Sequence, residues 1–206
     1  MTLGYHRRPP SHDAEAKSSL FWFAYMLDKG LALRLGRAPT THDYDVIRPS
    51  QAVGRPDLPY PWREVLELWI AHAEVQGLVY EQLYSARGLA RPPDQRAESA
   101  RLLAARIADI AARASAIQDT TAGPDTPTPG DVSLGMMSMS LFLKSDKVFY
   151  CSSLALAYRA VPATPGLPSS LSTECIEAAR EAFQSHQEFM ELIASSQVMR
   201  TAYLHW

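Results

Sequence analysis

Apolar residues recur at helical spacing along most of this 206-residue chain. Between residues 20 and 35 they follow one another at intervals of three and four, which places them on one face of a helix. We find no internal repeat and no segment of useful length that alternates apolar and polar residues as strands do. The sequence therefore predicts the all-α class, as an irregular multi-helix bundle of antiparallel helices. This first apolar stripe consists of Leu20, Phe23, Leu27, Leu31 and Leu35.

Capping residues, glycine and proline mark the ends of five expected helices. The first helix ends at Gly36 and Pro39, and either Ser11 or Asp13 caps its start. Gly30, inside this helix, costs up to about 1 kcal/mol relative to alanine unless a neighbouring helix approaches closely there. The other helices are expected at about 62–84, 94–117 and 141–160, and from residue 173, with Ser172 or Thr173 as the cap.

The later helices carry apolar stripes that we expect to face the core. Residues 119–131 are rich in proline, threonine and glycine, and we expect a flexible loop there, within one domain that covers 1–206. The stretch from Arg37 to Ser50 is expected to be extended. The predicted stripe of the helix at 62–84 is Leu66, Trp69 or Ile70, Ala73, Gly77, Tyr80 and Leu83. That of the helix at 94–117 is Leu103, Ile107, Ile110, Ala114 and Ile117. That of the helix from residue 173 is Ile176, Ala179, Phe183, His186 or Gln187, Met190 and Ile193.

Composition and charge exclude several classes of protein. Hydrophobic residues make up 47% and charged residues 20% of the chain, as in globular proteins. The net charge is −2 and the isoelectric point is near 6.3, so no basic field is present to bind nucleic acid directly. No apolar run is long enough to span a membrane, and the N-terminus lacks the apolar core of a secretory signal. We therefore predict no membrane association.

The chain has two cysteines, Cys151 and Cys175, which are too few for a disulfide framework or a structural zinc site. They form either one bridge or, as we expect, two buried free thiols. The sequence also lacks a glycine-rich phosphate loop and an HExxH zinc motif. We therefore expect no cofactor.

The stretch HDYDV is the strongest candidate for catalytic chemistry. It places Asp43 and Asp45 beside His42, and these are the residue types of an acid/base pair. In the alternative interpretation, which we favour, the two aspartates cap turns, pair with Arg34 or Arg37, or line the surface. The chain is then not an enzyme.

Two apolar clusters have structural and functional interpretations. The aromatic cluster of Phe21, Trp22, Phe23 and Tyr25 either stacks on the bases of a single-stranded nucleic acid or, as we expect, packs against other helices, because consecutive aromatics on a helix point in different directions. The methionine-rich stretch LGMMSMSLFL either fills gaps in the core or forms a pocket for an apolar effector.

The stretch LFWFAYMLDKGLALRLGRAPTTHDYDV resembles the fungal-specific transcription-factor domain, or middle homology region, of zinc-binuclear-cluster regulators. That family has an aromatic-rich helix, then Tyr-x-Leu-Asp-Lys/Arg, an aliphatic run into Leu-Gly-Arg-Pro, and a turn like Asp-Tyr-Asp-Ile. Here Ala38 separates the arginine from the proline. The signature residues are Trp22, Asp28, Gly36, Arg37, Asp43 and Asp45, with Phe21, Tyr25, Leu27, Lys29, Leu35 and Tyr44.

The signature has a physical interpretation as a structural clasp. Gly36 lets the helix end in a left-handed turn. The planar guanidinium of Arg37 is suited to bind carbonyls or the carboxylates of Asp43 and Asp45 across the turn. We therefore expect these residues to hold architecture together.

Two further segments resemble the same family, so the resemblance extends over residues 1–206. The family's Gln-Gly-x-x-Tyr-x-x-Leu-Tyr-Ser segment is matched at Gln76, Gly77, Tyr80, Leu83, Tyr84 and Ser85, and its Cys-x-x-Ala-Ala-Arg helix at Cys175, Ala178, Ala179 and Arg180.

The resemblance implies a partial regulatory domain of a fungal transcription factor, which controls transcription in the nucleus. The six-cysteine cluster that binds zinc and contacts DNA in this family is missing here, so zinc and DNA contact are expected only through a separate module. Protein partners or self-association, and a small-molecule effector, are implied. Two alternatives remain: an interaction partner that has lost DNA binding, and an enzyme acting on an apolar molecule with His42, Asp43, Asp45 or His186.

Overall fold

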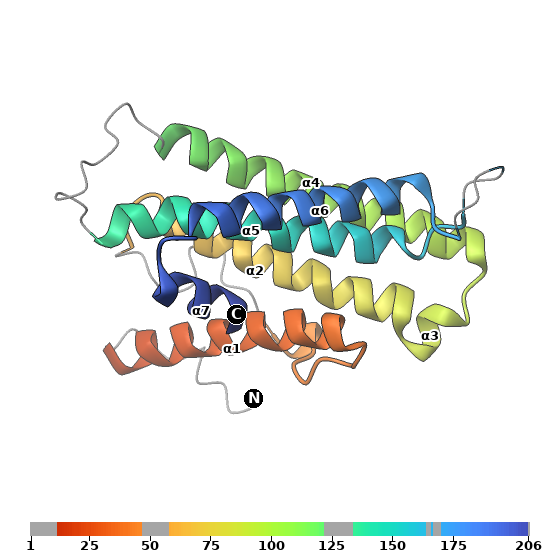
Figure 1. Cartoon of the computed structure of the whole chain (residues 1–206). Coiled ribbons are helices and arrows are strands. Elements are labelled where there is room, and N and C mark those ends of the chain that lie inside the picture. Colours follow the sequence, from red (N-terminus) through yellow and green to blue (C-terminus); the bar gives the residue numbers. More distant parts are fainter. Residues whose placement is uncertain (1–11, 47–57, 122–133, 164–165, 167–169, 206) are drawn as a thin grey trace. The chain divides into compact units, whose positions relative to one another are not determined.

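The computed structural model of the chain describes residues 12–46, 58–121, 134–163, 166 and 170–205. These ranges contain helices and turns but no strand, so the predicted all-α class is confirmed. In chain order the elements are α1 (His12–Leu35), the 3-10 turn η2 (Asp43–Asp45), α2 (Trp62–Val79), the π-helical segment η4 (Tyr80–Tyr84), α3 (Ala86–Leu89), α4 (Pro93–Thr121), α5 (Leu134–Tyr158), α6 (Thr173–Leu192) and α7 (Gln197–His205) (Figure 1).

The chain forms two compact units, Met1–Ser99 and Ala100–Trp206. In the first unit α1 packs against α2, and the two helices run in the same direction (Figure 1). Trp22 packs against Ile70, and further along both helices Gly30 lies beside Gln76. The predicted antiparallel arrangement is therefore wrong for this pair. The segment that joins the helices is long enough to return along α1, whose 24 residues span about 36 Å at 1.5 Å per residue.

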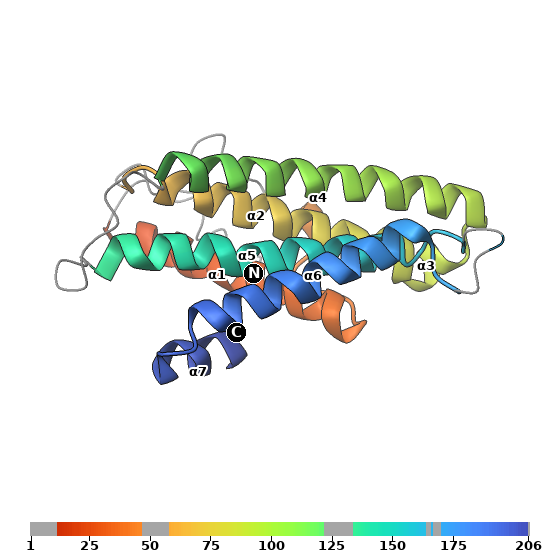
Figure 2. The same ribbon diagram turned by 45° about the horizontal axis from the view of Figure 1, so that its top comes forward.

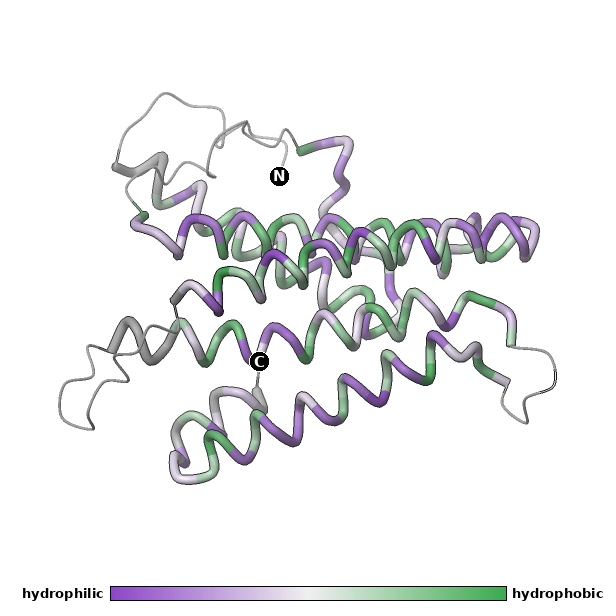
Figure 3. Tube along the Cα trace, turned by 90° about the horizontal axis from the view of Figure 1, so that it is seen from above, coloured by the Kyte–Doolittle hydropathy of each residue, from purple (hydrophilic) through white to green (hydrophobic). Residues whose placement is uncertain are grey.

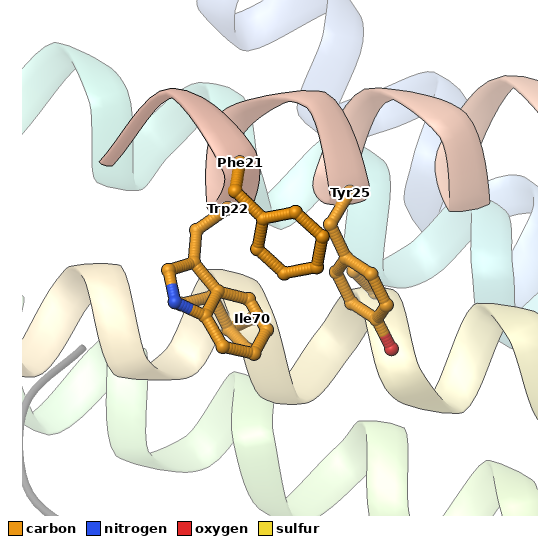
Figure 4. Packing of buried hydrophobic residues seen from close by; sticks show 5 residues of the cluster. Phe21, Trp22, Tyr25 and Ile70 are labelled. Carbon is orange, nitrogen blue, oxygen red and sulfur yellow. The ribbon is translucent and has the colours of Figure 1, made fainter. Parts of the chain in front are cut away.

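An aromatic cluster fills the contact between α1 and α2. Phe21, Trp22 and Tyr25 are buried and point from α1 toward Ile70 of α2 (Figure 4). The ring centroids of Phe21 and Trp22 lie 5.1 Å apart, and those of Trp22 and Tyr25 lie 5.4 Å apart, both in edge-to-face geometry. Such pairs stabilise a core by about 1 kcal/mol beyond the area that they bury. The prediction that this cluster packs between helices is confirmed for these three residues, whereas Phe23, the fourth aromatic residue of the cluster, is exposed.

In the second unit α5 and α6 lie side by side and run in opposite directions (Figure 2). The Cys175 thiol at the start of α6 donates to the carbonyl of Ala155 near the end of α5, at 3.4 Å. Earlier in α5, the Nζ atom of Lys147 lies 2.6 Å from a carboxylate oxygen of Glu181. For this pair the predicted antiparallel arrangement is confirmed.

The ends of α6 are fixed by side chains. The Ser172 hydroxyl accepts a hydrogen bond from the backbone N–H of Cys175 at 3.2 Å, so Ser172 is the cap, one of the two residues predicted for that position. After α6 the chain turns into α7, whose Tyr203 hydroxyl lies 2.8 Å from Nδ1 of His186. The ring of Tyr203 also packs against Phe189, with centroids 4.6 Å apart.

Two helix boundaries differ from the prediction. The fourth helix, α4, continues through Thr121, so the first three residues of the predicted loop 119–131 are helical; residues 122–133 lie outside the described ranges. The Thr120 hydroxyl donates to the carbonyl of Ile117, which supports this last turn. Helix α5 begins at Leu134, not near residue 141, because leucine and methionine in this stretch are good helix formers. The short turn η2 also interrupts the stretch predicted to be extended.

The apolar stripes are only partly where the sequence predicts them. On α4, Leu103, Ile107, Ile110 and Ala114 are buried as predicted. On α6 the buried face is formed by Cys175, Ser185 and Phe189, and the predicted stripe residue Phe183 is 76% exposed. Hydrophobic and hydrophilic residues are interspersed along the long helices, as expected where one face is buried (Figure 3).

Both cysteines are free and buried, as we expected. In the described parts of the chain, every helix is too short or too polar to cross a lipid bilayer.

Candidate functional site

The end of α1 and the turn after it bring the signature residues of the sequence together. We call this region the corner; it comprises Tyr25–Gly30 of α1, the connection Gly36–His42 and the turn η2. Gly36 ends the helix with φ of +64°, a left-handed conformation that favours glycine. The N–H of Gly36 bonds to the carbonyl of Leu33 and the N–H of Arg37 to that of Ala32, which is a Schellman motif. The predicted left-handed helix end is confirmed.

Asp28 anchors the connection to α1. Its two carboxylate oxygens accept hydrogen bonds from the backbone N–H groups of Thr40, at 3.0 Å, and Thr41, at 2.7 Å. Partial burial would by itself raise the pKa of Asp28, but these hydrogen bonds outweigh it and lower the pKa below its ordinary value of 3.8. The carboxylate is therefore ionised and fixes the path of the chain after the helix.

Lys29 and Asp43 form an ion pair beneath the corner. The Nζ atom of Lys29 lies 2.8 Å from Oδ1 of Asp43, and the lysine side chain is only 2% exposed. The Tyr25 hydroxyl donates to the same carboxylate oxygen at 2.7 Å. The ammonium also lies 5.2 Å from the centre of the Tyr25 ring, within the range of a cation–π contact. Asp43 is therefore held by α1 and in turn holds η2 against it.

Two glycines allow α1 and α2 to approach at this point. A Cβ atom on Gly77 would lie 2.9 Å from Nζ of Lys29, closer than real Cβ contacts allow. A Cβ atom on Gly30 would lie 3.3 Å from the side-chain oxygen of Gln76. Helix α2 therefore approaches α1 closely at Gly30, which is the condition under which a glycine inside this helix is expected. The resemblance segments around Lys29 and Gly77 thus meet in space.

A buried histidine lies on the same helix as Gly77. Burial, with a further contribution from the guanidinium of Arg34, lowers the pKa of His72 from 6.5 to about 3. The imidazole is therefore neutral near pH 7, as a core histidine and not a proton donor.

The predicted site residues have different surroundings. Trp22 lies in the aromatic cluster, and Asp28, Gly36 and Asp43 have the contacts given above. Arg37 and Asp45 are exposed. The ion pair predicted for the Arg37 guanidinium is wrong, because within the described ranges Lys29 takes that place on Asp43.

The residues of the enzyme alternative are divided between the two units. His42 is exposed and stacks on Tyr44, with ring centroids 5.1 Å apart, while Asp43 is engaged by Lys29. His186 belongs to the second unit and is bonded to Tyr203. In the part of the chain that the structure describes, no group of three histidine, cysteine, aspartate or glutamate side chains is placed to hold a metal ion.

The face of α1 opposite the aromatic cluster is apolar and exposed. We call it the α1 stripe; its residues share one helix face, as their spacing predicts, but that face is not the buried one. The buried face instead carries Trp22, Tyr25 and Lys29, because large aromatic rings bury more area than leucine at the same contact. The α1 stripe consists of Leu20, Phe23, Leu27, Leu31 and Leu35, which are between 41% and 69% exposed.

Comparison with protein-family models, with curated proteins and with solved structures gives no match for this chain. The likeness to the fungal transcription-factor domain therefore depends on the sequence motifs.

The role of Lys29 was not predicted, because Lys29 was identified only as a signature residue. The signal was present: Lys29 follows Tyr25 by four residues and Trp22 by seven, so it shares the buried face of the helix.

Proposed function

We propose that this chain is a regulatory domain of a fungal transcription factor. In this proposal it controls transcription in the nucleus through protein contacts and effector binding, and a separate module contacts DNA. Three motifs in family order support the proposal, as does the meeting of Lys29 and Gly77 from two of them. In the corner, Asp28 bonds to the backbone of the connection and Asp43 pairs with Lys29. These contacts stabilise the corner itself, which fits a structural role within a regulatory domain.

The observation that carries the proposal is the exposure of the α1 stripe. Contiguous exposed apolar side chains mark interaction sites, whereas isolated ones are common on any surface. Phe23, Leu27, Leu31 and Leu35 follow one another at intervals of four and form a continuous ridge.

We infer that the occupant of this surface is a second copy of the chain, packed stripe to stripe. In the sequence, Asp13 and Glu15 fall in the first turns of α1, Arg34 falls in its last turn, and Arg37 follows the helix. Two copies of α1 that run in opposite directions would bring the acidic start of each helix toward the basic end of the other. Such a two-fold interface uses the same patch on both copies, so one stripe is sufficient.

Light scattering coupled to size exclusion tests the proposed contact. The chain should elute as a dimer, and the Leu27→Glu/Leu31→Glu variant should elute as a monomer with an unchanged helical circular dichroism spectrum. Leu102→Glu is the matched control, because Leu102 is 64% exposed on α4 and lies outside the stripe. A monomeric parent chain, or a dimer that survives the double substitution, contradicts self-association through α1.

A tethering assay tests the regulatory role. Fused to an unrelated DNA-binding module, the chain should change transcription of a reporter gene in fungal cells. The double stripe variant should lose this effect and Leu102→Glu should keep it. Unfused, the chain should give no specific retardation in a mobility-shift assay. A reporter signal equal to that of the DNA-binding module alone would remove the support for a regulatory function.

A further inference from the structure

The second unit contains a cavity of about 540 Å³ between α4, α5 and α6. This volume is in the range of small-molecule sites, about 300–1,000 Å³. Ala114, Leu143 and Phe189 give it apolar walls, one from each helix. Leu143 belongs to the methionine-rich stretch in which the sequence analysis allowed for a pocket.

A buried hydroxyl lies in the wall of this cavity. Ser185 is 4% exposed, and its Oγ atom has no hydrogen-bond partner among the described residues. A buried polar group without a partner costs about 1–3 kcal/mol, so such groups are rare in folded proteins. A hydroxyl both donates and accepts, and one oxygen on a ligand is enough to satisfy it.

The charged residues that line the cavity carry no net formal charge, because Lys144 and Lys147 are matched by Asp119 and Glu188. Lys147 is paired with Glu181 at 2.6 Å, and Glu188 accepts a hydrogen bond from Gln184 at 2.9 Å. The hydrogen bond that Lys147 donates to Glu181 raises the pKa of Lys147, so its ammonium group stays charged. Since a charged ligand would have to be desolvated in a site whose lining has no net charge, the cavity favours a neutral ligand.

The cysteine in the wall is a weak nucleophile at neutral pH. Burial, with a contribution from Glu181, raises the pKa of Cys151, so its thiol is protonated near pH 7. Cys151 therefore lines the site as a small apolar side chain that takes part in no covalent step.

We propose that this cavity binds a neutral, mostly apolar small molecule that bears one carbonyl or hydroxyl oxygen, which bonds to the hydroxyl of Ser185. The inference rests on the proposed function only in naming such a molecule an effector. Binding itself is measured on the purified chain and does not involve the α1 stripe.

Nile red, a neutral apolar dye with one carbonyl group, is the probe. Its fluorescence should rise saturably, with one dye per chain. Ala111→Phe, which places a ring in the cavity, should weaken the affinity for the dye at least about ten-fold. This corresponds to a loss of at least about 1.4 kcal/mol of binding free energy. Ala112→Phe is the matched control, because the next residue of α4 is exposed and lies outside the lining. The Leu27→Glu/Leu31→Glu variant should bind as the parent does, which separates the cavity from dye adsorption to the stripe.

Two further measurements test binding in this cavity even if Ala111→Phe does not fold. Ser185→Ala should weaken dye affinity about five-fold, the value of one hydrogen bond, without lowering the stability of the free chain. Bound dye should also slow alkylation of Cys151 but not of Cys175, which is buried elsewhere. The proposal is overturned if no saturable binding occurs, if dye binding is lost in the stripe variant, or if Ser185→Ala and Cys151 are both unaffected.

Discussion

The ammonium of Lys29 lies 2.8 Å from the carboxylate of Asp43, although the lysine is 2% exposed and the aspartate side chain 38%. The pair joins α1 to η2 and is open to water on one side only. A buried ammonium needs such a partner, because an unpaired charge in the core is strongly destabilising.

Asp43→Asn should lower the free energy of unfolding by about 1–3 kcal/mol. Breaking a fully buried pair costs about 3–5 kcal/mol, and the partial exposure of Asp43 reduces this cost. Asp45→Asn is the control, because Asp45 lies in the same turn and is exposed. Urea unfolding measures both variants. Equal stabilities would show that the pair does not hold η2 in place.

Gly77→Ala should be destabilising in the parent chain and stabilising when Lys29 is also replaced by alanine. In a helix, alanine is favoured over glycine by about 1 kcal/mol, but the new Cβ would lie 2.9 Å from Nζ of Lys29. Removal of the lysine side chain removes that clash. A double-mutant cycle by urea unfolding measures the coupling. The same effect of Gly77→Ala in both backgrounds would contradict the packing of Lys29 over Gly77.

His72 should make the chain less stable as the pH falls below 6.5. The unfolded chain takes up a proton near pH 6.5, whereas the folded chain takes it up only near pH 3. The contribution of neutral His72 to the free energy of unfolding is therefore complete above pH 6.5, and it declines by about 1.4 kcal/mol per pH unit between pH 6.5 and pH 3.

Urea unfolding between pH 7 and pH 4 checks this slope in the parent chain, in His72→Gln and in His42→Gln. His72→Gln should flatten the dependence on pH, and His42→Gln should retain it, because His42 is exposed. If the stability of His72→Gln still falls with pH at the same slope, groups other than His72 cause the dependence on pH.

Helical periodicity was sufficient to predict the fold class and most helices, because the spacing of apolar residues reports local geometry directly. It failed for the buried face of α1, since both faces of that helix are apolar. The stripe through Leu27 has the more regular spacing, yet Trp22 and Tyr25 determine the contact with α2. Which of two apolar faces is buried depends on the neighbouring helix, and the spacing contains no information about it.

The candidate site was predictable in part. Gly36 and Asp28 have roles that follow from local chemistry, a left-handed helix end and an acceptor for backbone N–H groups. The partner of Asp43 depends on three-dimensional packing, and arginine was preferred there because it lies closer in sequence and has a planar donor group. Of the cavity beside Ser185 only one wall was indicated, by the methionine-rich stretch that ends at Leu143, because the cavity forms only when three helices meet.

The burial of Lys29 has a consequence for post-translational chemistry. An acetyltransferase or a ubiquitin ligase must reach the ε-amine, and in the folded chain that nitrogen lies beneath Gly77 and against Asp43. Lys144 and Lys147, by contrast, present their amines on the second unit, at partly exposed positions. Modification found at Lys29 would therefore identify molecules whose first unit had opened, and would serve as a marker of damaged or newly made chains.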